Sequence, residues 1–133
     1  MPTVMVVEDQ PNLCVLYRQE LEDEGYEVVV AQSGTEALAA VGRQQVDVVV
    51  LDIAMPGMDG IETLGRILAV DNCLPVILNT AYAGYQDDFL TWAAEAYVVK
   101  SGDLTELKER IAAAVARRTQ AAQPTVPPDA QEA

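Results

Sequence analysis

Acidic residues stand at the ends of two apolar segments that have the character of buried strands. Glu8 and Asp9 follow segment 3–7, and Asp52 follows the run VVVL at 48–51. If these strands are neighbours, three carboxylates share one edge of a sheet. Two unit charges about 4 Å apart repel each other by about 4 kcal/mol at an effective dielectric of about 20. Carboxylates so close together either take up protons or bind a cation.

The chemistry of this acidic group favours phosphoryl transfer. A small set of hard oxygen ligands with room for water suits Mg²⁺ better than Ca²⁺ or zinc. Thr80 and Lys100, which follow two later apolar segments, offer a hydroxyl and a cation to an incoming anion. A nucleophile, a metal and donors for the equatorial oxygens are the parts that phosphoryl transfer requires. Asp52 is the predicted nucleophile, because carboxylates form acyl-phosphate intermediates.

The composition argues against several other kinds of site. The chain of 133 residues suits one domain and has no histidine, which removes Ser-His, Cys-His and His-metal catalysis. Its 21 acidic and 8 basic residues give a net charge of −13, which argues against binding to nucleic acid or an anionic membrane. Cys14 and Cys73 are isolated, and we expect both to be buried thiols in a reducing compartment, the cytoplasm.

Five short apolar segments alternate with helical patterns along the chain. The predicted strands cover residues 3–7, 27–31, 46–52, 76–79 and 97–99. Pro11 is placed to open the first helix and Gly25 to end it. Three further helix starts have the spacing of capping boxes: Ser33 with Glu36, Asp59 with Glu62, and Asp103 with Glu106. The predicted buried helix faces carry Leu13, Leu16, Tyr17 and Leu21; Leu38 and Val41; Ile61, Leu64, Ile67 and Leu68; Phe89 and Trp92; and Leu104, Leu107, Ile111 and Val115.

This alternation predicts an α/β protein with a doubly wound, five-stranded parallel sheet and helices on both faces. Periodicity does not fix the strand order, and the flavodoxin-like order 2-1-3-4-5 with right-handed crossovers is the most economical choice. In such sheets, sites form outside the carboxyl ends of the strands, near the switch in strand order. The three acids, Thr80 and Lys100 all stand at predicted strand ends.

Four segments together resemble the receiver domain of response regulators in two-component signalling, of the single-domain, chemotaxis-regulator kind. They are VMVVEDQ (4–10), VVVLDIAMPGMDG (48–60), VILNTAY (76–82) and AYVVKSGDL (96–104). Each segment alone is weak support, but all four occur in the order and at the spacing of the family. The resemblance covers about residues 3–118 of this chain.

The resemblance implies a role for each matching position of the metal site. Asp52 matches the phosphoacceptor, which takes a phosphoryl group from a histidine kinase or a phosphotransfer protein. Glu8 and Asp9 match the acidic pair that binds Mg²⁺, with Asp52 and the backbone carbonyl of Ala54 completing the protein ligands. The first acid is more often aspartate, so Glu8 brings a longer arm to the metal. These expectations come from the family and not from the spacing alone.

The resemblance also implies a switch. Thr80 matches the hydroxyl residue that moves toward the phosphoryl group, Lys100 the lysine of the site, and Tyr97 the aromatic residue that turns inward. An unknown output protein is then expected to bind the face formed by the helix of Phe89 and Trp92, the strand at 97–99 and the last helix. The family has a cis proline after the lysine. Ser101 stands there in this chain, so we expect a trans bond with a rearranged loop or a strained cis bond, which costs about 2.5–4 kcal/mol.

Several alternatives remain open from the sequence. We expect a receiver domain at 1–118 and a flexible tail at 119–133, which fits either a complete single-domain regulator or the receiver piece of a larger regulator or kinase. We expect a switch that modifies itself, not a turnover enzyme. A Mg²⁺-dependent phosphatase of the haloacid-dehalogenase kind would carry a second acid where Ala54 stands. A flavodoxin-like binding module would need a phosphate-binding loop where EDQPN (8–12) stands. A receiver that takes no phosphate would not need the complete acidic set.

The resemblance implies a phosphorylated form that is long-lived unless a phosphatase acts. Ala54 and Tyr82 occupy two positions that tune dephosphorylation in the family, and neither side chain is an acid or amide that could orient an attacking water. Timing the loss of phosphate from purified protein in Mg²⁺ checks this expectation. Decay within a few seconds would contradict it.

Overall fold

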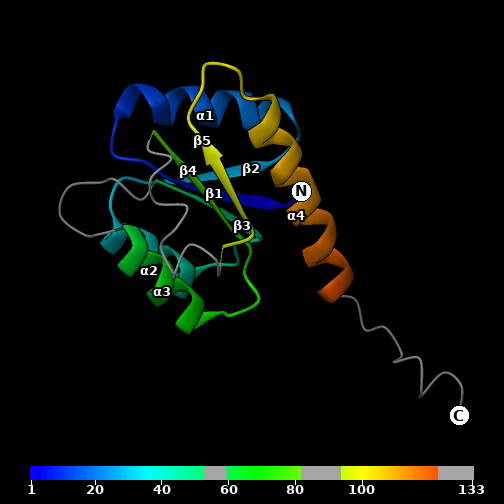
Figure 1. Ribbon diagram of the computed structural model, residues 1–133. Helices are drawn as coiled ribbons and strands as arrows, with labels where there is room; N and C mark the ends of the chain where they lie inside the picture. The colour runs from blue at the N-terminus through cyan, green and yellow to red at the C-terminus, as the bar shows by residue number, and fades with distance from the viewer. Residues whose placement is uncertain (53–59, 82–93, 123–133) are drawn as a thin grey trace, which may run out of the picture.

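The fold is built on a parallel sheet of five strands in the order β2-β1-β3-β4-β5, drawn in Figure 1. The computed structural model describes residues 1–52, 60–81 and 94–122, the last four as backbone only. The strands are β1 (Thr3–Val7), β2 (Glu27–Ala31), β3 (Val48–Leu51), β4 (Val76–Thr80) and β5 (Ala96–Val99). All four neighbouring pairs are parallel. The predicted doubly wound fold and its strand order are confirmed.

Helices cover both faces of this sheet. In Figure 1, α1 (Pro11–Asp23) and α4 (Thr105–Ala122) lie on one side, and α2 (Gly34–Arg43) and α3 (Gly60–Val70) lie on the other. We call these the α1/α4 face and the α2/α3 face. Every residue of β3 and β4 is buried, as expected for central strands of a parallel sheet that is covered on both sides.

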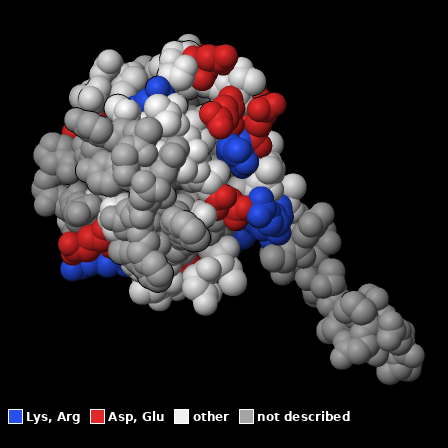
Figure 2. Space-filling model, in the orientation of Figure 1, with Lys and Arg blue, Asp and Glu red and all other residues white. Residues whose placement is uncertain are grey.

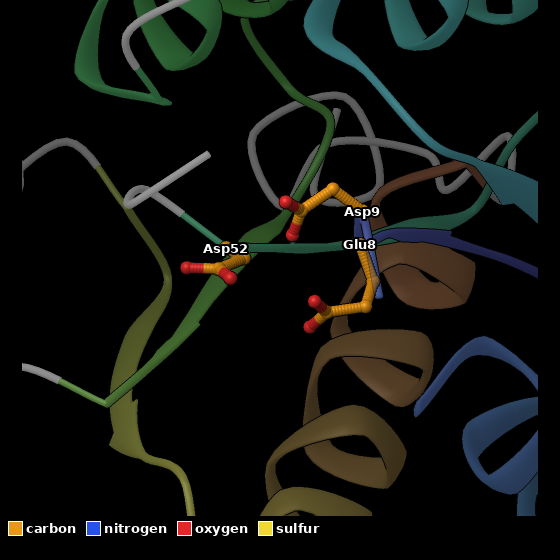
Figure 3. A group of neighbouring side chains, drawn as sticks. All are labelled: Glu8, Asp9 and Asp52. Carbon is orange, nitrogen blue, oxygen red and sulfur yellow. The ribbon is translucent and has the colours of Figure 1, made fainter. Parts of the chain in front are cut away.

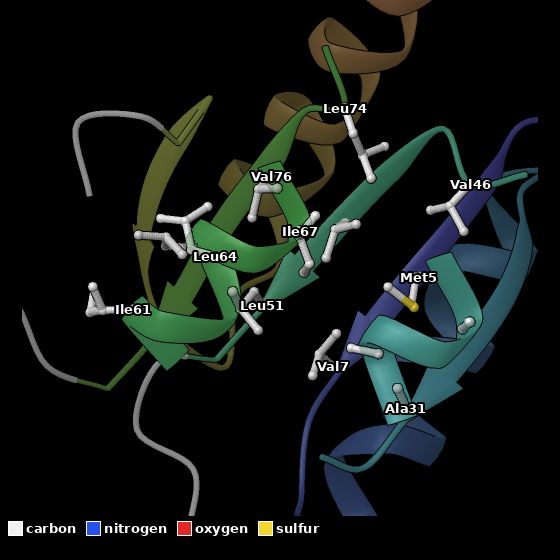
Figure 4. Close-up of a cluster of buried hydrophobic side chains, with 14 residues drawn as sticks. Met5, Val7, Ala31, Val46, Leu51, Ile61, Leu64, Ile67, Leu74 and Val76 are labelled. Carbon is white, nitrogen blue, oxygen red and sulfur yellow. The ribbon is translucent and has the colours of Figure 1, made fainter. Parts of the chain in front are cut away.

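A separate hydrophobic cluster fills each face. Side chains alternate along the strands, so Val7 and Leu51 pack under α2 and α3 while Val6 and Val50 pack under α1 and α4. Figure 4 shows the cluster of the α2/α3 face, in which Leu64 of α3 is fully buried. Because of this alternation, the polar residues at the strand ends are also divided between the two faces.

The predicted signals at helix ends act where they were expected. Pro11 is the first residue of α1, and Gly25, with φ +96°, stands two residues after its end. Ser33 Oγ accepts a hydrogen bond from the Glu36 N–H at 3.1 Å. Glu36 Oε1 accepts in return from the N–H of Gln32 at 3.1 Å, one residue earlier than in the standard capping box.

The start of α4 differs slightly from the prediction. The helix begins at Thr105, and Asp103 Oδ1 accepts from both the Thr105 N–H (2.9 Å) and its hydroxyl (2.6 Å). At its other end, α4 runs to Ala122, past the boundary expected at residue 118. The capping residue Asp59, the helix of Phe89 and Trp92, and residues 123–133 lie outside the described residues.

Two predictions of burial were wrong. Leu16 is 39% exposed, because the side of α1 that faces the sheet is centred on Cys14, Tyr17 and Leu21. Cys73 is exposed, while Cys14 is buried as expected. Cys73 belongs to a surface turn, in which its N–H donates to Asp71 Oδ1 at 3.0 Å.

Ion pairs fasten α4 to its neighbours. Lys108 Nζ lies 2.8 Å from Glu20 Oε1 of α1, and Arg118 lies 2.9 Å from Asp71 after α3. The face in Figure 2 likewise shows basic side chains next to acidic ones. None of the described helices combines the length and the apolar character that crossing a membrane requires.

Matched leucine truncations should separate core from surface. Leu64→Ala is expected to lower the free energy of unfolding by about 2–5 kcal/mol, because it leaves a cavity in a fully buried site. Leu16→Ala should lower it by less than about 1 kcal/mol, because that side chain is partly in water. Urea denaturation of both variants measures this, and equal losses would contradict the burial pattern.

Candidate functional site

The carboxyl ends of β1 and β3 bring three acids together. Backbone hydrogen bonding continues one residue past each strand: the Glu8 N–H donates to Ala31 O at 2.9 Å, and the Asp52 N–H donates to Val7 O at 3.1 Å. One carboxylate oxygen from each of Glu8, Asp9 and Asp52 lies within 4.8 Å of the other two. In Figure 3 the three carboxylates lie around one space. The predicted convergence of these acids is present in the fold.

Lys100 joins this acidic group from β5. Its Nζ lies 2.7 Å from Glu8 Oε1 and 2.9 Å from Asp52 Oδ2, and the three side chains are only 15%, 1% and 6% exposed. The Lys100 N–H donates to Thr80 O at 2.7 Å, which extends the β4–β5 ladder to the site. No peptide bond among the described residues is cis, so the Lys100–Ser101 bond is trans. Of the two expected forms of this bond, the trans form is the one present.

Burial and charge act together on the ionisation of these groups. Burial raises the pKa of the Glu8 carboxyl, and the hydrogen bond and charge of Lys100 oppose that effect only in part. Burial on its own would lower the pKa of Lys100, but hydrogen bonds to Glu8 and Asp52 outweigh it and hold that pKa above the ordinary 10.5. Lys100 is therefore a cation at neutral pH, inside the acidic group.

Thr80 and Tyr97 lie on the opposite face from Lys100. Leu78 belongs to the α2/α3 face and Tyr97 packs against the same cluster. Thr80, two residues after Leu78, shares that face by strand alternation and is fully buried. Leu78 is paired with Tyr97 in the register of β4 and β5. Thr80 therefore lies on the strand next to Tyr97, two residues beyond the level of its ring.

The structure contains a polar pair that the sequence reasoning missed. Asn79 Nδ2 donates a hydrogen bond of 3.1 Å to the hydroxyl of Tyr17, and both side chains are buried on the α1/α4 face. We predicted Tyr17 as a core residue and Asn79 only as a strand end. The signal in the sequence was an amide directly after the apolar run VIL (76–78).

The donors of this site fit Mg²⁺. Glu8, Asp9 and Asp52 supply only hard oxygen ligands, within the 4.8 Å noted above. Asp9 is partly exposed, so the group is open to water on that side, and Mg²⁺ usually keeps several waters. Ala54, the expected backbone ligand, and Tyr82 lie outside the described residues.

Removing the positive charge of Lys100 should destabilise the domain. Lys100→Met leaves Glu8 and Asp52 buried without their partner, and we expect a loss of about 3–5 kcal/mol in unfolding free energy at pH 7 without metal. Because the pKa of Lys100 is raised in the folded state, its contribution is complete below 10.5 and is lost as pH rises through the folded value. The difference between wild type and variant should therefore shrink in strong alkali.

Urea denaturation over a pH series measures this difference. Lys108→Met is the matched control, since Lys108 pairs with Glu20 at the surface, and its loss should be much smaller. A Lys100→Met variant as stable as wild type, or a difference that persists unchanged in alkali, would contradict the buried ion group.

Comparisons with known proteins agree with this arrangement. The sequence profile of the response regulator receiver domain matches residues 4–112. The sporulation initiation phosphotransferase F of Bacillus subtilis is 32% identical over 110 residues, which are 81% of this chain and 89% of that protein. The uncharacterized transcriptional regulatory protein YkoG of Bacillus subtilis is 38% identical over 114 residues, 84% of this chain and 50% of YkoG. Several such curated relatives are about twice as long, so the chain spans about half of their length.

Solved structures lead to the same family. The response regulator TrrA from Thermotoga maritima, in complex with Mg²⁺-BeF, is 43% identical with a TM-score of 0.83, covering 86% of this chain and 99% of TrrA. In the complex of TrrA with the histidine kinase ThkA, the TM-score is 0.82 at the same identity and coverage. With its strand order, its acidic group and its lysine at the carboxyl edge of the sheet, the chain belongs to the family of response regulator receiver domains of two-component signalling.

Proposed function

We propose that this domain is a phosphorelay switch in which Asp52 accepts a phosphoryl group from the phosphohistidine of a histidine kinase or phosphotransfer protein. The observation that carries the proposal is the position of Asp52 between the Glu8–Asp9 pair and the ammonium of Lys100. The kinase complex of the similar regulator TrrA supports the choice of donor.

The groups of the site have complementary roles in this transfer. A carboxylate oxygen of Asp52 forms the new P–O bond as the P–N bond to the donor imidazole breaks, and the imidazole leaves with a proton. Lys100, which holds Asp52 Oδ2 at 2.9 Å, orients the carboxylate and offers its ammonium to a phosphoryl oxygen. Glu8, Asp9 and Asp52 would hold Mg²⁺, which supplies positive charge for the phosphoryl oxygens when bound.

The switch lies in Thr80 and Tyr97. A phosphoryl oxygen on Asp52 attracts the Thr80 hydroxyl, and the space that Thr80 leaves is filled by the Tyr97 ring. The burial of Thr80 and the packing of Tyr97 on the same α2/α3 face support this coupling. The two packings then differ in the surface formed by β5 and α4, where an output protein binds. The helix of Phe89 and Trp92, the third part of the expected face, lies outside the described residues.

The domain acts by contact and not by turnover. Asp52 is both catalyst and product in this proposal, and Ala54 gives no second acid of the kind that haloacid-dehalogenase phosphatases use. The net charge of −13 supports protein partners over nucleic acid or membrane for this domain. The isolated cysteines support a reducing compartment, the cytoplasm. The length of the curated relatives supports a second form, in which the domain is the receiver of a larger multidomain regulator or kinase.

Intact-mass spectrometry with a small phosphodonor tests the proposal. In Mg²⁺ and acetyl phosphate, the wild type should gain one phosphoryl group, and Asp52→Asn should gain none, because an amide is not a nucleophile for this transfer. Removal of Mg²⁺ with a chelator should abolish most of the labelling.

Asp23→Asn is the matched control, since Asp23 is an exposed residue at the end of α1 and far from the site in the fold. It should be labelled like the wild type. Equal labelling of Asp52→Asn would place the acceptor at another residue and overturn the proposal.

A further inference from the structure

A neutral polar pair lies next to the charged group on the α1/α4 face. Asn79 Nδ2 donates to the Tyr17 hydroxyl at 3.1 Å, across 62 residues of sequence. Tyr17 is 3% and Asn79 also 3% exposed. Packing alone does not require polar side chains at this position. On the same face, the residues two positions earlier in the strands are all apolar: Val6, Val50 and Ile77.

The strand register places Asn79 in the same row as the acids. Val7 pairs with Leu51 and Leu51 with Leu78, so the next residues, Glu8, Asp52 and Asn79, are level on three neighbouring strands. By alternation from Val6, Val50 and Ile77, these three side chains share the α1/α4 face. Asn79 is thus the neighbour of Asp52 on the side toward β5.

Lys100 must pass over β4 to make its contacts. It follows β5, while Asp52 follows β3 and Glu8 follows β1, and β4 lies between β5 and β3. Val98 of β5 is level with Asn79 in the strand register, so Lys100 stands two residues beyond that row on the same face of the sheet. Neighbouring strands are about 4.8 Å apart, so the lysine side chain spans the end of β4, beside Asn79, to reach Asp52 and Glu8. The longer side chain of Glu8 shortens the remaining gap from the other side.

The electrostatic surroundings of Tyr17 agree with this placement. Burial raises the pKa of the Tyr17 phenol, while the hydrogen bond from Asn79 and the positive charge of Lys100 act to lower it, and Glu8 and Asp52 act to raise it. The phenol is therefore within the field of all three charged groups.

We propose that Tyr17 and Asn79 are positioning residues for Lys100: their hydrogen-bonded pair supports the lysine side chain where it crosses β4 and aims its ammonium at Asp52. A dipolar pair in this place solvates the buried charges in a way that an apolar pair would not. The proposal rests on the proposed function, since aiming Lys100 matters for phosphoryl transfer to Asp52.

The test compares the pair in two backgrounds. We measure the rate at which the protein gains a phosphoryl group from acetyl phosphate in Mg²⁺. Wild type is compared with the double variant Tyr17→Phe/Asn79→Leu, and Lys100→Ala is compared with the variant that carries all three changes. We expect the double variant to be slower by about tenfold, the effect of one lost hydrogen bond on a rate. In the Lys100→Ala background the same change should have no further effect.

A purely structural role gives a different result, because loss of general stability would slow labelling equally in both backgrounds. Equal losses would therefore overturn the proposal. Replacing both partners leaves no buried polar group unpaired, so the double variant should remain folded. If it does not, Tyr17→Phe alone is compared in the same two backgrounds. Tyr26→Phe is the matched control, since it removes a phenol at the opposite end of the sheet and should leave the rate unchanged.

A crystal structure of the metal-free double variant gives a readout that does not depend on phosphorylation. The proposal expects Lys100 Nζ to leave at least one of its contacts, at 2.7 Å to Glu8 and 2.9 Å to Asp52 in the wild type. Retention of both contacts would overturn it. Absence of labelling in the wild type would instead contradict the proposed function, and this structure would still decide the role of the pair.

Discussion

The mutual repulsion of carboxylates at one edge of the sheet is the constraint that organises this domain. Glu8 and Asp52 are almost fully buried side by side, where negative charge is tolerated only with a nearby cation. The strand order places β1 next to β3, which creates the crowding. It places β5 two strands from β3 and three from β1, and Lys100 reaches both acids from there. The same order therefore creates the electrostatic problem and supplies a cation that relieves it.

The sheet also separates two tasks by the direction of its side chains. Glu8, Asp52 and Asn79 project to the α1/α4 face with Lys100, and Thr80 and Tyr97 project to the α2/α3 face. A change in charge at Asp52, on one side of the sheet, can thus affect the packing of the Tyr97 ring on the other side through Thr80 at the end of β4. Because packed interiors favour a few discrete arrangements, such a connection suits a switch better than a gradual response.

Much of this could be predicted from the sequence, because the decisive signals are local. The alternation of apolar runs with helical patterns predicts the fold class, and the acids after two of these runs predict the edge that carries the site. Pro11 and Ser33 mark helix starts. What failed depends on three-dimensional surroundings. The exposure of Leu16 depends on which side of α1 packs against the sheet, and that of Cys73 depends on the geometry of a surface turn. The partner of Asn79 is 62 residues away, beyond any local pattern.

The unequal exposure of the three acids sets a direction of approach. Glu8 and Asp52 are closed off by the protein, while Asp9 is partly open to water. Lys100, on the other side of Asp52, also keeps some exposure, so an incoming ion or phosphodonor meets these two side chains first. The two have opposite charges, so an approaching group is attracted by one and repelled by the other before any bond to Asp52 begins to form.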